Sequence, residues 1–525
     1  MTIFSRMSSV AVRRRRLPQV RAVPGSVFAS AALLSGLLAL SLFIRTRNLD
    51  AWFWIDEGLS VGISTHPLLD IPGVLRQDGS PPLYYMLLNV WLDVVGRSEE
   101  QTHLLSLGFA LLTVPAGLWA GWSLFGRRTG WICAGLFAVN PFLSHYAQET
   151  RMYSLLILLS LLASACFLHA FVFRRRAYLA PFAVLLALML YTHNWALFFG
   201  AGCVAALLPV WLAADDRRAL ARDALLAFGG AAVLFLPWLP TLAYQATNTG
   251  APWALAPSFN EALRGLSRVL DGNGPAIGAL LGVGAGVAAV LRQGPSRVRT
   301  ALIAVLTIFL ATLVIAFVAS QVSPAWALRY YAVLLGPLLL LLAAGLARAS
   351  GLGIAVLVVL ALFWVNLSSS DSDYKSNLRG VVVTLAEELR PGDLVISTHP
   401  ERLPNVEYYL GGNFRYATSF GPSSDARVMD WRDARERLER ASVPGTLEAL
   451  LDSLPRGRHV LLVQPVTNQS RSWDAPWTSL VKHRAREWGR YLAHDERFKR
   501  TGSAPPPDQA RKLNIGVRAV LYTKT

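Results

Sequence analysis

Eleven apolar stretches, separated by short polar segments, occupy most of the first 367 residues. A bilayer core is crossed by about 20 helical residues, and kinked or tilted helices manage with slightly different lengths. The pattern therefore predicts an α-helical polytopic membrane protein. The predicted helices lie near 27–44, 104–125, 130–147, 153–173, 177–193, 195–213, 224–244, 275–291, 300–321, 331–347 and 351–367.

Arginine clusters between these stretches predict how the chain crosses the membrane. Cytoplasmic loops carry an excess of Lys and Arg. If every cluster is cytoplasmic, the N-terminus lies inside and the chain after the eleventh helix lies outside. We expect a multi-pass protein of a bacterial plasma membrane, in which the first helix is a retained signal anchor. The clusters are Arg13–Arg16, Arg127–Arg128, Arg174–Arg176, Arg217–Arg218, Arg292–Arg299 and Arg348.

A twelfth apolar run, Pro81–Trp91, is short and opens with two prolines. Counting it as a span would put Arg127–Arg128 outside and invert every later cluster. We therefore expect an interfacial amphipathic helix on the outer leaflet. It belongs to a first external loop that runs from about residue 45 to residue 103.

The hydropathy falls after Leu367, and the remaining residues read as a small external α/β domain. A segment of this length can bury one core. Short apolar runs between turn residues predict strands, and one helical pattern precedes them. The predicted helix is Val381–Leu389, and the predicted strands are Leu394–Ser397, Val460–Val463 and Val517–Tyr522.

Composition agrees with this division into a basic segment (1–26), a membrane domain (27–367) and an external domain (368–525). Hydrophobic residues make up 53% of the chain, and the mean hydropathy is +0.40. The net charge of +17 would suggest nucleic acid in a soluble protein. Topology explains the arginines, so no nucleic-acid partner is expected. The scattered cysteines are predicted to be small core residues: Cys133, Cys166 and Cys203.

An acidic pair gives the strongest chemical signal. Asp56 and Glu57 follow Trp52-Phe53-Trp54, about a dozen residues after the first predicted helix. Acids beside an aromatic belt at a bilayer surface are costly to desolvate, so they are usually solvated, paired or functional. An ordinary loop is the alternative at this point. The same external loop also holds His66, Asp78 and His103.

Two arginines lie outside against the charge bias of the other clusters. Arg151 follows the third predicted helix, and Arg329 precedes the tenth. Guanidinium groups match phosphate oxygens, so acids and arginines at one membrane face suit a lipid substrate that carries phosphate. The alternative is that both arginines pair with Glu149 or with loop carbonyls. Further polar segments predicted at this face are Tyr191–Trp195 and Tyr244–Asp271.

The order of these motifs resembles the C-type glycosyltransferase superfamily. The likeness is nearest to the protein O-mannosyltransferases and aminoarabinose transferases of glycosyltransferase family 39. It rests on the Asp-Glu pair, the Pro-Pro-Leu segment, Gln148–Tyr153 and Arg329-Tyr330, and it covers about 27–367. It implies direct displacement, with inversion, of a sugar from a polyprenyl-phosphate donor. The acceptor would be a glycan, lipid or protein outside the cytoplasm.

The resemblance also implies roles for single residues. Asp56 would be the general base that deprotonates the acceptor hydroxyl. Arg151 and Arg329 would stabilise the departing phosphate. Glu57 and Glu149 would position the sugar or orient an arginine. The remaining candidates on the substrate side are Tyr84, Tyr153 and Tyr330, which offer stacking faces or hydroxyls unless they only pack, and His145, for which a local hydrogen bond is the alternative.

Two departures narrow the substrate, and other functions stay open. Ser80-Pro81-Pro82 stands where the aminoarabinose branch has Lys-Pro, and there is no room for the domain inserted in protein mannosyltransferases. Asp56 and Glu149 could share a divalent metal, but no compact ligand set is present, so we expect no metal and no other cofactor. Alternatives are a transporter or flippase, an envelope polymerase or ligase, and a scaffold.

Overall fold

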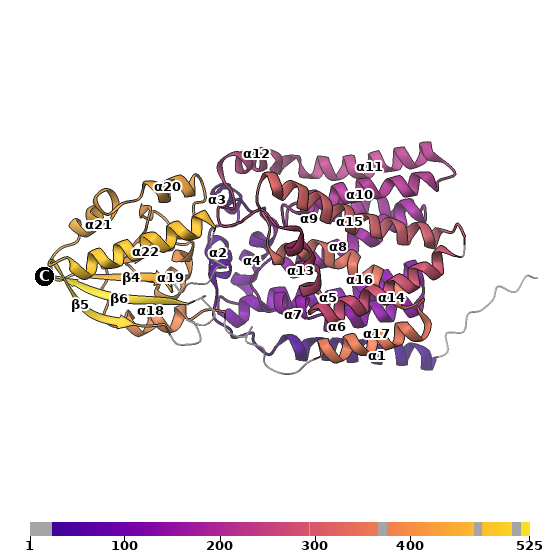
Figure 1. The fold of residues 1–525 in the computed structure, drawn as a ribbon, viewed down its shortest axis with the longest axis horizontal. Coiled ribbons are helices and arrows are strands. Elements are labelled where there is room, and N and C mark those ends of the chain that lie inside the picture. Colours follow the sequence, from indigo (N-terminus) through magenta and orange to yellow (C-terminus); the bar gives the residue numbers. More distant parts are fainter. Residues whose placement is uncertain (1–23, 293, 366–374, 467–474, 507–515) are drawn as a thin grey trace, which may run out of the picture.

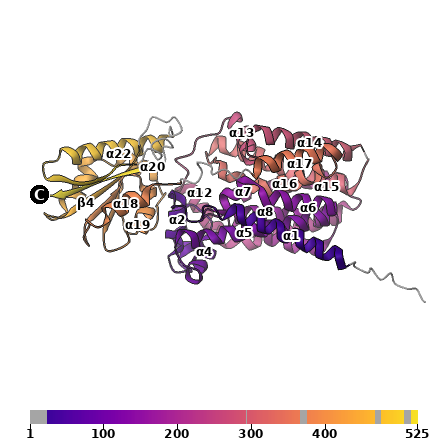
Figure 2. The same cartoon turned by 90° about the horizontal axis from the view of Figure 1, so that it is seen from below.

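The computed structural model describes residues 24–292, 294–365, 375–466, 475–506 and 516–525. A long helical bundle and a smaller domain with a sheet meet end to end (Figure 1). A 90° turn keeps them in line, so the smaller domain caps one end of the bundle (Figure 2). The predicted boundary at 26/27 falls inside the first helix, Pro24–Arg45, and the one at 367/368 lies outside the described residues.

Each of the eleven predicted stretches is helical, and within the described residues seven helices are long and apolar enough to cross a membrane. The chain is an integral membrane protein. The seven are α1 (Pro24–Arg45), α5 (Glu99–Phe125), α8 (Tyr153–Phe167) with the π-helical turn Leu168–Val172, α11 (Arg217–Phe235) running through Leu236–Trp238 into α12 (Leu239–Asn248), α14 (Asn273–Leu291), α15 (Arg297–Val322), and α16 (Ala332–Leu346) preceded by the 3₁₀ turn Leu328–Tyr331. Shorter helices are α6 (Arg127–Val139), α9 (Leu179–Leu190), α10 (Ala196–Leu212) and α17 (Ser350–Trp364).

The single helix predicted over 130–147 is wrong. The chain leaves the helical conformation at Asn140, which is extended, and α7 (Pro141–Ala147) starts anew. A residue before proline is pushed out of the α region, and proline at the first helical position costs no hydrogen bond. The Asn140 side chain caps the new helix by accepting from Leu143 N at 2.9 Å. This break lets the chain turn before it reaches the loop 148–152.

The core of the bundle lies around α8 and α16, whose residues are nearly all buried. The two helices approach closely at Gly336, where an added Cβ would lie 2.3 Å from Ser160 Oγ. Small residues at such contacts let helix backbones pack tightly in a membrane. The cysteines are buried and unbonded, which confirms their predicted packing role: Cys133, Cys166 and Cys203.

One buried arginine fixes the end of α1. Arg45 is fully buried, and its guanidinium donates to Ser41 Oγ at 2.7 Å, Ala110 O at 3.2 Å and Phe137 O at 2.6 Å. A contact to Ser144 Oγ at 3.3 Å completes the set. Because these acceptors come from α1, α5, α6 and α7, the side chain ties four helices together at one point.

The arginine clusters among the described residues lie at the bundle end away from the sheet domain, and Arg13–Arg16 falls outside the described residues. Arg127 Nη2 reaches Ser30 Oγ near the start of α1 at 3.4 Å, and Arg348 lies over the Phe125 ring. Arg174 and Arg176 both pair with the buried carboxylate of Asp223, at 3.1 and 3.0 Å. Figures 1 and 2 show α1 beginning at this end.

Three short helices of the first loop lie at the opposite end of the bundle, towards the sheet domain (Figure 1): α2 (Ile55–Ser64), α3 (Ile71–Asp78) and α4 (Leu83–Val94). Helix α4 holds the run predicted to be interfacial. Its 12 residues correspond to about 18 Å of helix, shorter than a bilayer core of about 30 Å. Its position relative to lipid stays a prediction. A further short helix, α13 (Phe259–Val269), follows the long loop after α12.

The C-terminal domain is built on a six-stranded mixed sheet with the order β3-β2-β1-β4-β6-β5. Strand β1 pairs in parallel with β2 and β4, and the other pairs are antiparallel. The three predicted strands are confirmed, and the predicted helix is shifted to 378–386. The elements are α18 (Leu378–Ala386), β1 (Leu394–Ser397), α19 (Leu403–Leu410), β2 (Arg415–Thr418), β3 (Gly421–Pro422), α20 (Ala434–Arg440), α21 (Glu448–Asp452), β4 (His459–Pro465), α22 (Pro476–His494), β5 (Phe498–Ala504) and β6 (Val517–Lys524), with short helical turns at Pro400–Arg402 and Val443–Leu447.

The C-terminal domain packs directly on α2. Gly58 and Gly62 share one face of this helix, and an added Cβ would lie 2.2 Å from Asn405 Oδ1 or 2.1 Å from the Arg427 carbonyl oxygen, respectively. The Asn405 amide donates to Trp54 O at 2.8 Å, and Phe53 N donates to Tyr409 OH at 2.8 Å. The helix that carries the acidic pair is therefore covered by residues more than 300 positions later in the chain.

Candidate active site

The acidic pair occupies the first turn of α2, where negative charge is favoured by the helix dipole. Trp54 is extended, and its backbone N–H donates to Glu57 Oε2 at 3.2 Å, which caps the helix. Successive residues of a helix point about 100° apart. Asp56 and Glu57 therefore face different surroundings, although they are adjacent in the sequence.

Asp56 lies between Arg151 and Arg329, the two arginines predicted to lie on the external side of the membrane. Its Oδ2 is 3.8 Å from Arg151 Nη2 and 3.6 Å from Arg329 Nη2, and 14% of its side chain is exposed. Arg151 is oriented by bonds from Nη1 to the Asp56 carbonyl at 3.2 Å and to Ser60 Oγ at 3.0 Å. The carboxylate thus lies between two positive charges, and both nitrogen–oxygen distances are longer than those of a hydrogen bond.

Three aromatic rings surround the guanidinium of Arg329. Its Cζ lies 5.7, 4.8 and 5.4 Å from the ring centroids of Trp54, Trp253 and Tyr330. A cation over aromatic faces gains electrostatic attraction without losing its hydrogen-bond donors. The rings therefore hold Arg329 in place while its nitrogen atoms stay available to a ligand.

Buried polar atoms without a partner gather around this cluster. Within the described part of the chain, no hydrogen-bond partner reaches Glu149 Oε2, Arg151 Nε, Arg329 Nε or Trp54 Nε1. Buried polar groups are nearly always paired, and those that are not commonly belong to functional sites or bind ordered water. Donors from two arginines and an acceptor from Glu149 suit a polar, anionic ligand.

Glu149 and His145 form a local pair at the edge of the site. His145 Nε2 lies 3.2 Å from Glu149 Oε1, and Glu149 is almost completely buried, whereas 45% of the His145 side chain is exposed. The Glu149 carbonyl accepts from Arg151 N at 2.8 Å. His145 therefore engages one carboxylate oxygen and leaves the other for the site.

Tyr153 and Tyr330 line the same region with His193 between them. The His193 ring lies 6.0 Å from Tyr153 and 4.8 Å from Tyr330. Burial and the positive charges of Arg151 and Arg329 lower the pKa of His193 to about 3, so its imidazole is neutral. Because Nδ1 accepts from Trp195 N at 3.1 Å, the proton of the neutral ring belongs on Nε2.

Tyr84 does not reach the cluster, and its neighbour Tyr85 does. The Tyr84 hydroxyl is fully buried and 3.0 Å from Ser106 Oγ, which in turn donates to the Arg151 carbonyl. Tyr85 OH is 3.5 Å from Arg151 Nη1. Adjacent residues on α4 point to different faces of the helix. Tyr84 therefore contacts the backbone of Arg151 through Ser106, while Tyr85 faces the Arg151 guanidinium.

Glu57 is also set apart from the Asp56 cluster. It is fully buried and accepts from His103 Nε2 at 2.6 Å, Thr150 N at 2.9 Å and Lys375 Nζ at 3.0 Å. Burial alone would raise its pKa, but the charges of Lys375 and His103 lower the pKa to about 2. With all of these partners, the Glu57 carboxylate has a structural role and does not act as the base that accepts a substrate proton.

Several contributors were missed among the sequence candidates. Trp253 lies in the long segment after α12, where no pattern singled it out, and Lys375 begins the C-terminal domain. Burial raises the pKa of Asp78. The negative charge of Asp56 also raises it, and the positive charge of Arg151 lowers it, so Asp78 is close enough to interact electrostatically with the Asp56 cluster. The described residues contain no group of three or more His, Cys, Asp or Glu side chains able to hold a metal.

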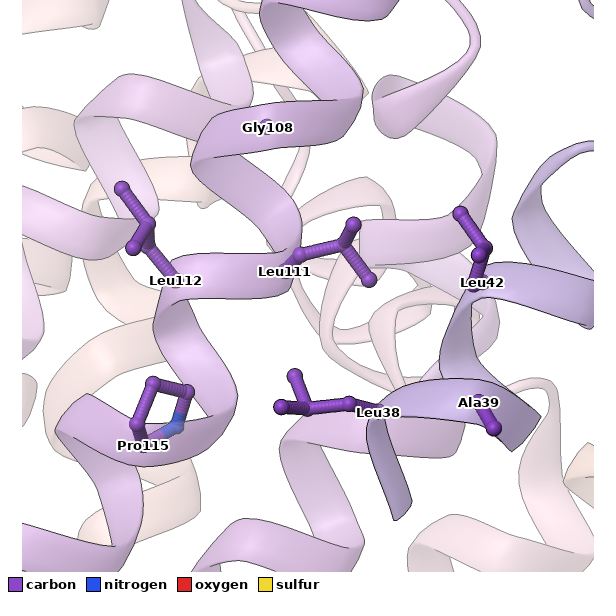
Figure 3. Close-up of a pocket in the computed structure, with 7 residues that line it drawn as sticks. All are labelled: Leu38, Ala39, Leu42, Gly108, Leu111, Leu112 and Pro115. Atoms are coloured by element: carbon purple, nitrogen blue, oxygen red, sulfur yellow. The ribbon is translucent and has the colours of Figure 1, made fainter. Parts of the chain in front are cut away.

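An apolar groove lies apart from these residues, between α1 and α5 (Figure 3). Its volume is about 380 Å³, and its lining carries no polar side-chain atom. The groove therefore offers no chemistry of its own and is distinct from the Asp56 cluster. Its lining residues are Leu38, Ala39, Leu42, Gly108, Leu111, Leu112 and Pro115.

Comparisons with known proteins identify the fold. No family model matches the sequence, and no curated protein matches it. Among solved structures, ArnT from Cupriavidus metallidurans bound to undecaprenyl phosphate aligns with TM-score 0.62 at 15% identity, over 96% of this chain and 99% of ArnT. AglB, an oligosaccharyltransferase from Archaeoglobus fulgidus in complex with an inhibitory peptide and a dolichol-phosphate, gives 0.60 at 10% identity, over 93% and 81%.

A third similar structure is the mycobacterial arabinofuranosyltransferase AftD, with TM-score 0.52 at 17% identity, over 94% of this chain and 41% of AftD. Two of the three structures are named as glycosyltransferases of different kinds, an oligosaccharyltransferase and an arabinofuranosyltransferase. Nearly the whole of the present chain takes part in each alignment. The chain therefore has the fold of the C-type glycosyltransferases.

Proposed function

We propose that this protein is a membrane glycosyltransferase that moves a sugar from a polyprenyl-phosphate donor to an acceptor outside the cytoplasm. The observation that carries the proposal is the Asp56 carboxylate between Arg151 and Arg329, at the capped end of the membrane bundle. The likeness to ArnT and AglB, solved with undecaprenyl phosphate and dolichol-phosphate, supports a lipid-phosphate donor and favours a transferase over a transporter.

The chemistry assigns different tasks to the acid and the arginines. Asp56 takes the proton of the acceptor hydroxyl as that oxygen attacks the anomeric carbon. The bond to the lipid phosphate breaks on the opposite side, so the configuration inverts. Arg151 and Arg329 stabilise the charge that develops on the departing phosphate. Both have a buried Nε without a partner among the described residues, which such an anion would satisfy.

Glu149, Tyr153 and Tyr330 are placed to bind the sugar between these groups. The free Oε2 of Glu149 accepts from a sugar hydroxyl, and the tyrosine rings offer flat apolar faces. His145 shares the first oxygen of Glu149 and fixes its direction. The acceptor is a glycan, a lipid or a protein, and the shape of the substrate-binding site selects the donor sugar. No metal or other cofactor enters the proposed reaction.

The catalytic assignment is tested by Asp56→Asn, which keeps the shape but cannot take a proton. The assay is sugar release or transfer from undecaprenyl-phosphate hexoses and pentoses by protein in liposomes, with envelope glycan, lipid and peptide acceptors. Loss of a general base costs about 10²–10⁴-fold in rate. The matched control is Asp50→Asn, an exposed acid six positions earlier, which should keep full activity. Near-normal turnover by Asp56→Asn would remove it from the mechanism.

Failure of the wild type to consume any of these donors would instead overturn the transferase proposal and favour transport. An undecaprenyl-phosphate binding titration separates the cases, because binding without turnover would keep the lipid as ligand and reject only the reaction. Arg329→Ala should weaken that binding and slow transfer, since it contacts phosphate before and during the reaction.

We place the C-terminal domain outside the cytoplasm and the N-terminus inside a bacterial plasma membrane. The arginine clusters at the far end of the bundle support this orientation, because such clusters favour the cytoplasm. Ala493 is exposed on α22, and the native cysteines are buried. Ala493→Cys should therefore react with an impermeant thiol reagent in whole cells, and labelling only after lysis would invert the orientation.

A further inference from the structure

The Glu57 carboxylate joins four separate parts of the chain. It caps its own helix through Trp54 N, receives His103 from α5 and receives the backbone N–H of Thr150 from the loop 148–152. The fourth partner is Lys375. A buried carboxylate with donors from every side fixes the elements that carry those donors, because leaving any donor unpaired is costly.

Lys375 reaches this point from the first described residues of the C-terminal domain. Its Nζ lies 3.0 and 3.2 Å from the two oxygens of Glu57 and 2.5 Å from the Gln148 carbonyl oxygen. It also lies 3.3 Å from His103 Nε2, and only 8% of its side chain is exposed. One ammonium group therefore bridges α2 and the loop 148–152.

These two elements carry the groups that face each other in the candidate active site. Asp56 precedes Glu57 on α2, and Arg151 follows Thr150 on the loop. The hydroxyls of Thr102 and Thr150, 2.7 Å apart, tie the loop to α5 as well. Glu57 is next to Asp56 and Thr150 is next to Arg151 in the sequence. The contacts that Lys375 makes there therefore set the distance between the Asp56 carboxylate and the Arg151 guanidinium.

We infer that Lys375 is a positioning residue of the transferase site, through which the C-terminal domain holds the general base in register with the phosphate-binding arginine. The inference rests on the proposed function for its consequence on rate, but not for its structural content. Lys375 touches no reacting atom, and it acts through Glu57 and the Gln148 carbonyl.

A neighbouring ion pair offers a matched comparison. Arg379, four residues later, pairs with Glu99 of α5 at 3.3 Å and also joins the two domains. Its side chain is 48% exposed, so the pair is a surface contact of small energetic value. If the C-terminal domain acted only by docking, the two cations would be equivalent. If Lys375 positions the site, only its loss should affect the site.

The experiment compares Lys375→Met, Lys375→Arg and Arg379→Gln in liposomes with the wild type. We expect Lys375→Met to lower kcat by about a hundredfold, the effect of a displacement near 1 Å in a catalytic site. Undecaprenyl-phosphate affinity should fall less than kcat, because Arg329 comes from a different element and still binds the phosphate when Arg151 is displaced. Lys375→Arg should recover part of the rate, and Arg379→Gln should match the wild type.

A second measurement does not depend on activity. Hydrogen exchange followed by mass spectrometry should show faster exchange in residues 55–64 and 148–152 of Lys375→Met, with the rest of the bundle unchanged. The double variant Glu57→Gln/Lys375→Met removes both buried charges and should lose less rate than the single losses combined, since a lone buried charge is the costlier state.

The outcomes are distinct. Unchanged exchange at 55–64 and 148–152, or equal loss in Lys375→Met and Arg379→Gln, overturns the positioning role. Faster exchange together with a wild type that consumes no lipid-linked sugar keeps the positioning contact and rejects the transferase. Faster exchange with a selective loss of kcat establishes both.

Discussion

A single methyl group on α2 tests how the C-terminal domain is seated. Gly62→Ala places a Cβ 2.1 Å from the carbonyl oxygen of Arg427. Ordinary van der Waals contact begins near 3.4 Å, so the two backbones must separate by more than an ångström. The Arg427 carbonyl belongs to the backbone and a Cβ is fixed rigidly to it, so neither group can swing aside as the end of a long side chain would.

The cost follows from two opposing effects. Overpacking a tight contact costs about 1–3 kcal/mol, while replacing a helical glycine by alanine returns about 0.5–1 kcal/mol. We expect Gly62→Ala to be destabilised by roughly 1–2 kcal/mol at this interface. Gly73→Ala is the matched control, because Gly73 lies on the neighbouring helix α3 with nothing within 4 Å of its added Cβ.

Thermal unfolding in detergent and limited proteolysis provide the measurement. Gly62→Ala should unfold at lower temperature and release the C-terminal domain to protease sooner, whereas Gly73→Ala should equal or exceed the wild type. Transfer activity should fall with Gly62→Ala, since Asp56 lies on the displaced helix. If both alanine variants behave alike, the close seating of the domain on α2 is wrong.

Three further changes probe other features. The pKa of Glu57 is lowered from 4.5 to about 2 by Lys375 and His103 against the effect of burial, which corresponds to roughly 3 kcal/mol. This contribution is complete above pH 4.5 and is lost as the pH falls towards 2. The unfolding temperature should therefore fall more steeply with decreasing pH in the wild type than in Glu57→Gln; an equal pH dependence of the two unfolding temperatures would contradict this. Arg45→Lys should lower the unfolding temperature by the equivalent of about 2 kcal/mol, because one ammonium cannot reach acceptors on four helices; an unchanged midpoint would show that these contacts contribute little. Arg329→Lys keeps the charge but loses the planar fork, and undecaprenyl-phosphate titration should show about tenfold weaker binding; equal affinity would mean that charge alone suffices.

The membrane helices could be predicted because their signal is local. Hydropathy over a window of about 20 residues identifies a span without knowledge of its neighbours, and all eleven stretches are helical. The break at Asn140 was also local, since Pro141 marks it, but the apolar run continues through the proline and concealed it. Within the C-terminal domain, the strands with the most buried apolar residues stood out, whereas β2 and β5 are more exposed and carry mixed residues.

Site residues could be predicted where a charged residue departs from the pattern expected near a membrane. They could not be predicted where the contact joins residues far apart in the sequence. Asp56, Arg151 and Arg329 were found as charges out of place and do converge. The predicted Tyr84 is one residue from Tyr85, whose hydroxyl faces Arg151, because a motif gives a position in the sequence but not the face of a helix. No local pattern marks Lys375, since its meaning depends on Glu57, 318 positions earlier.

The separation of Glu57 and Lys375 in the sequence also sets the order in which the residues around Glu57 are synthesised. At about 5–20 residues per second, roughly 15–60 s pass between the synthesis of Glu57 and that of Lys375. His103 and Thr150 follow Glu57 by only 46 and 93 positions, so both are synthesised well before Lys375. A chain that stalls or is truncated before its last domain would lack the final anchor. An unfinished chain would therefore keep Glu57 and the loop 148–152 but lack the ammonium group that links them.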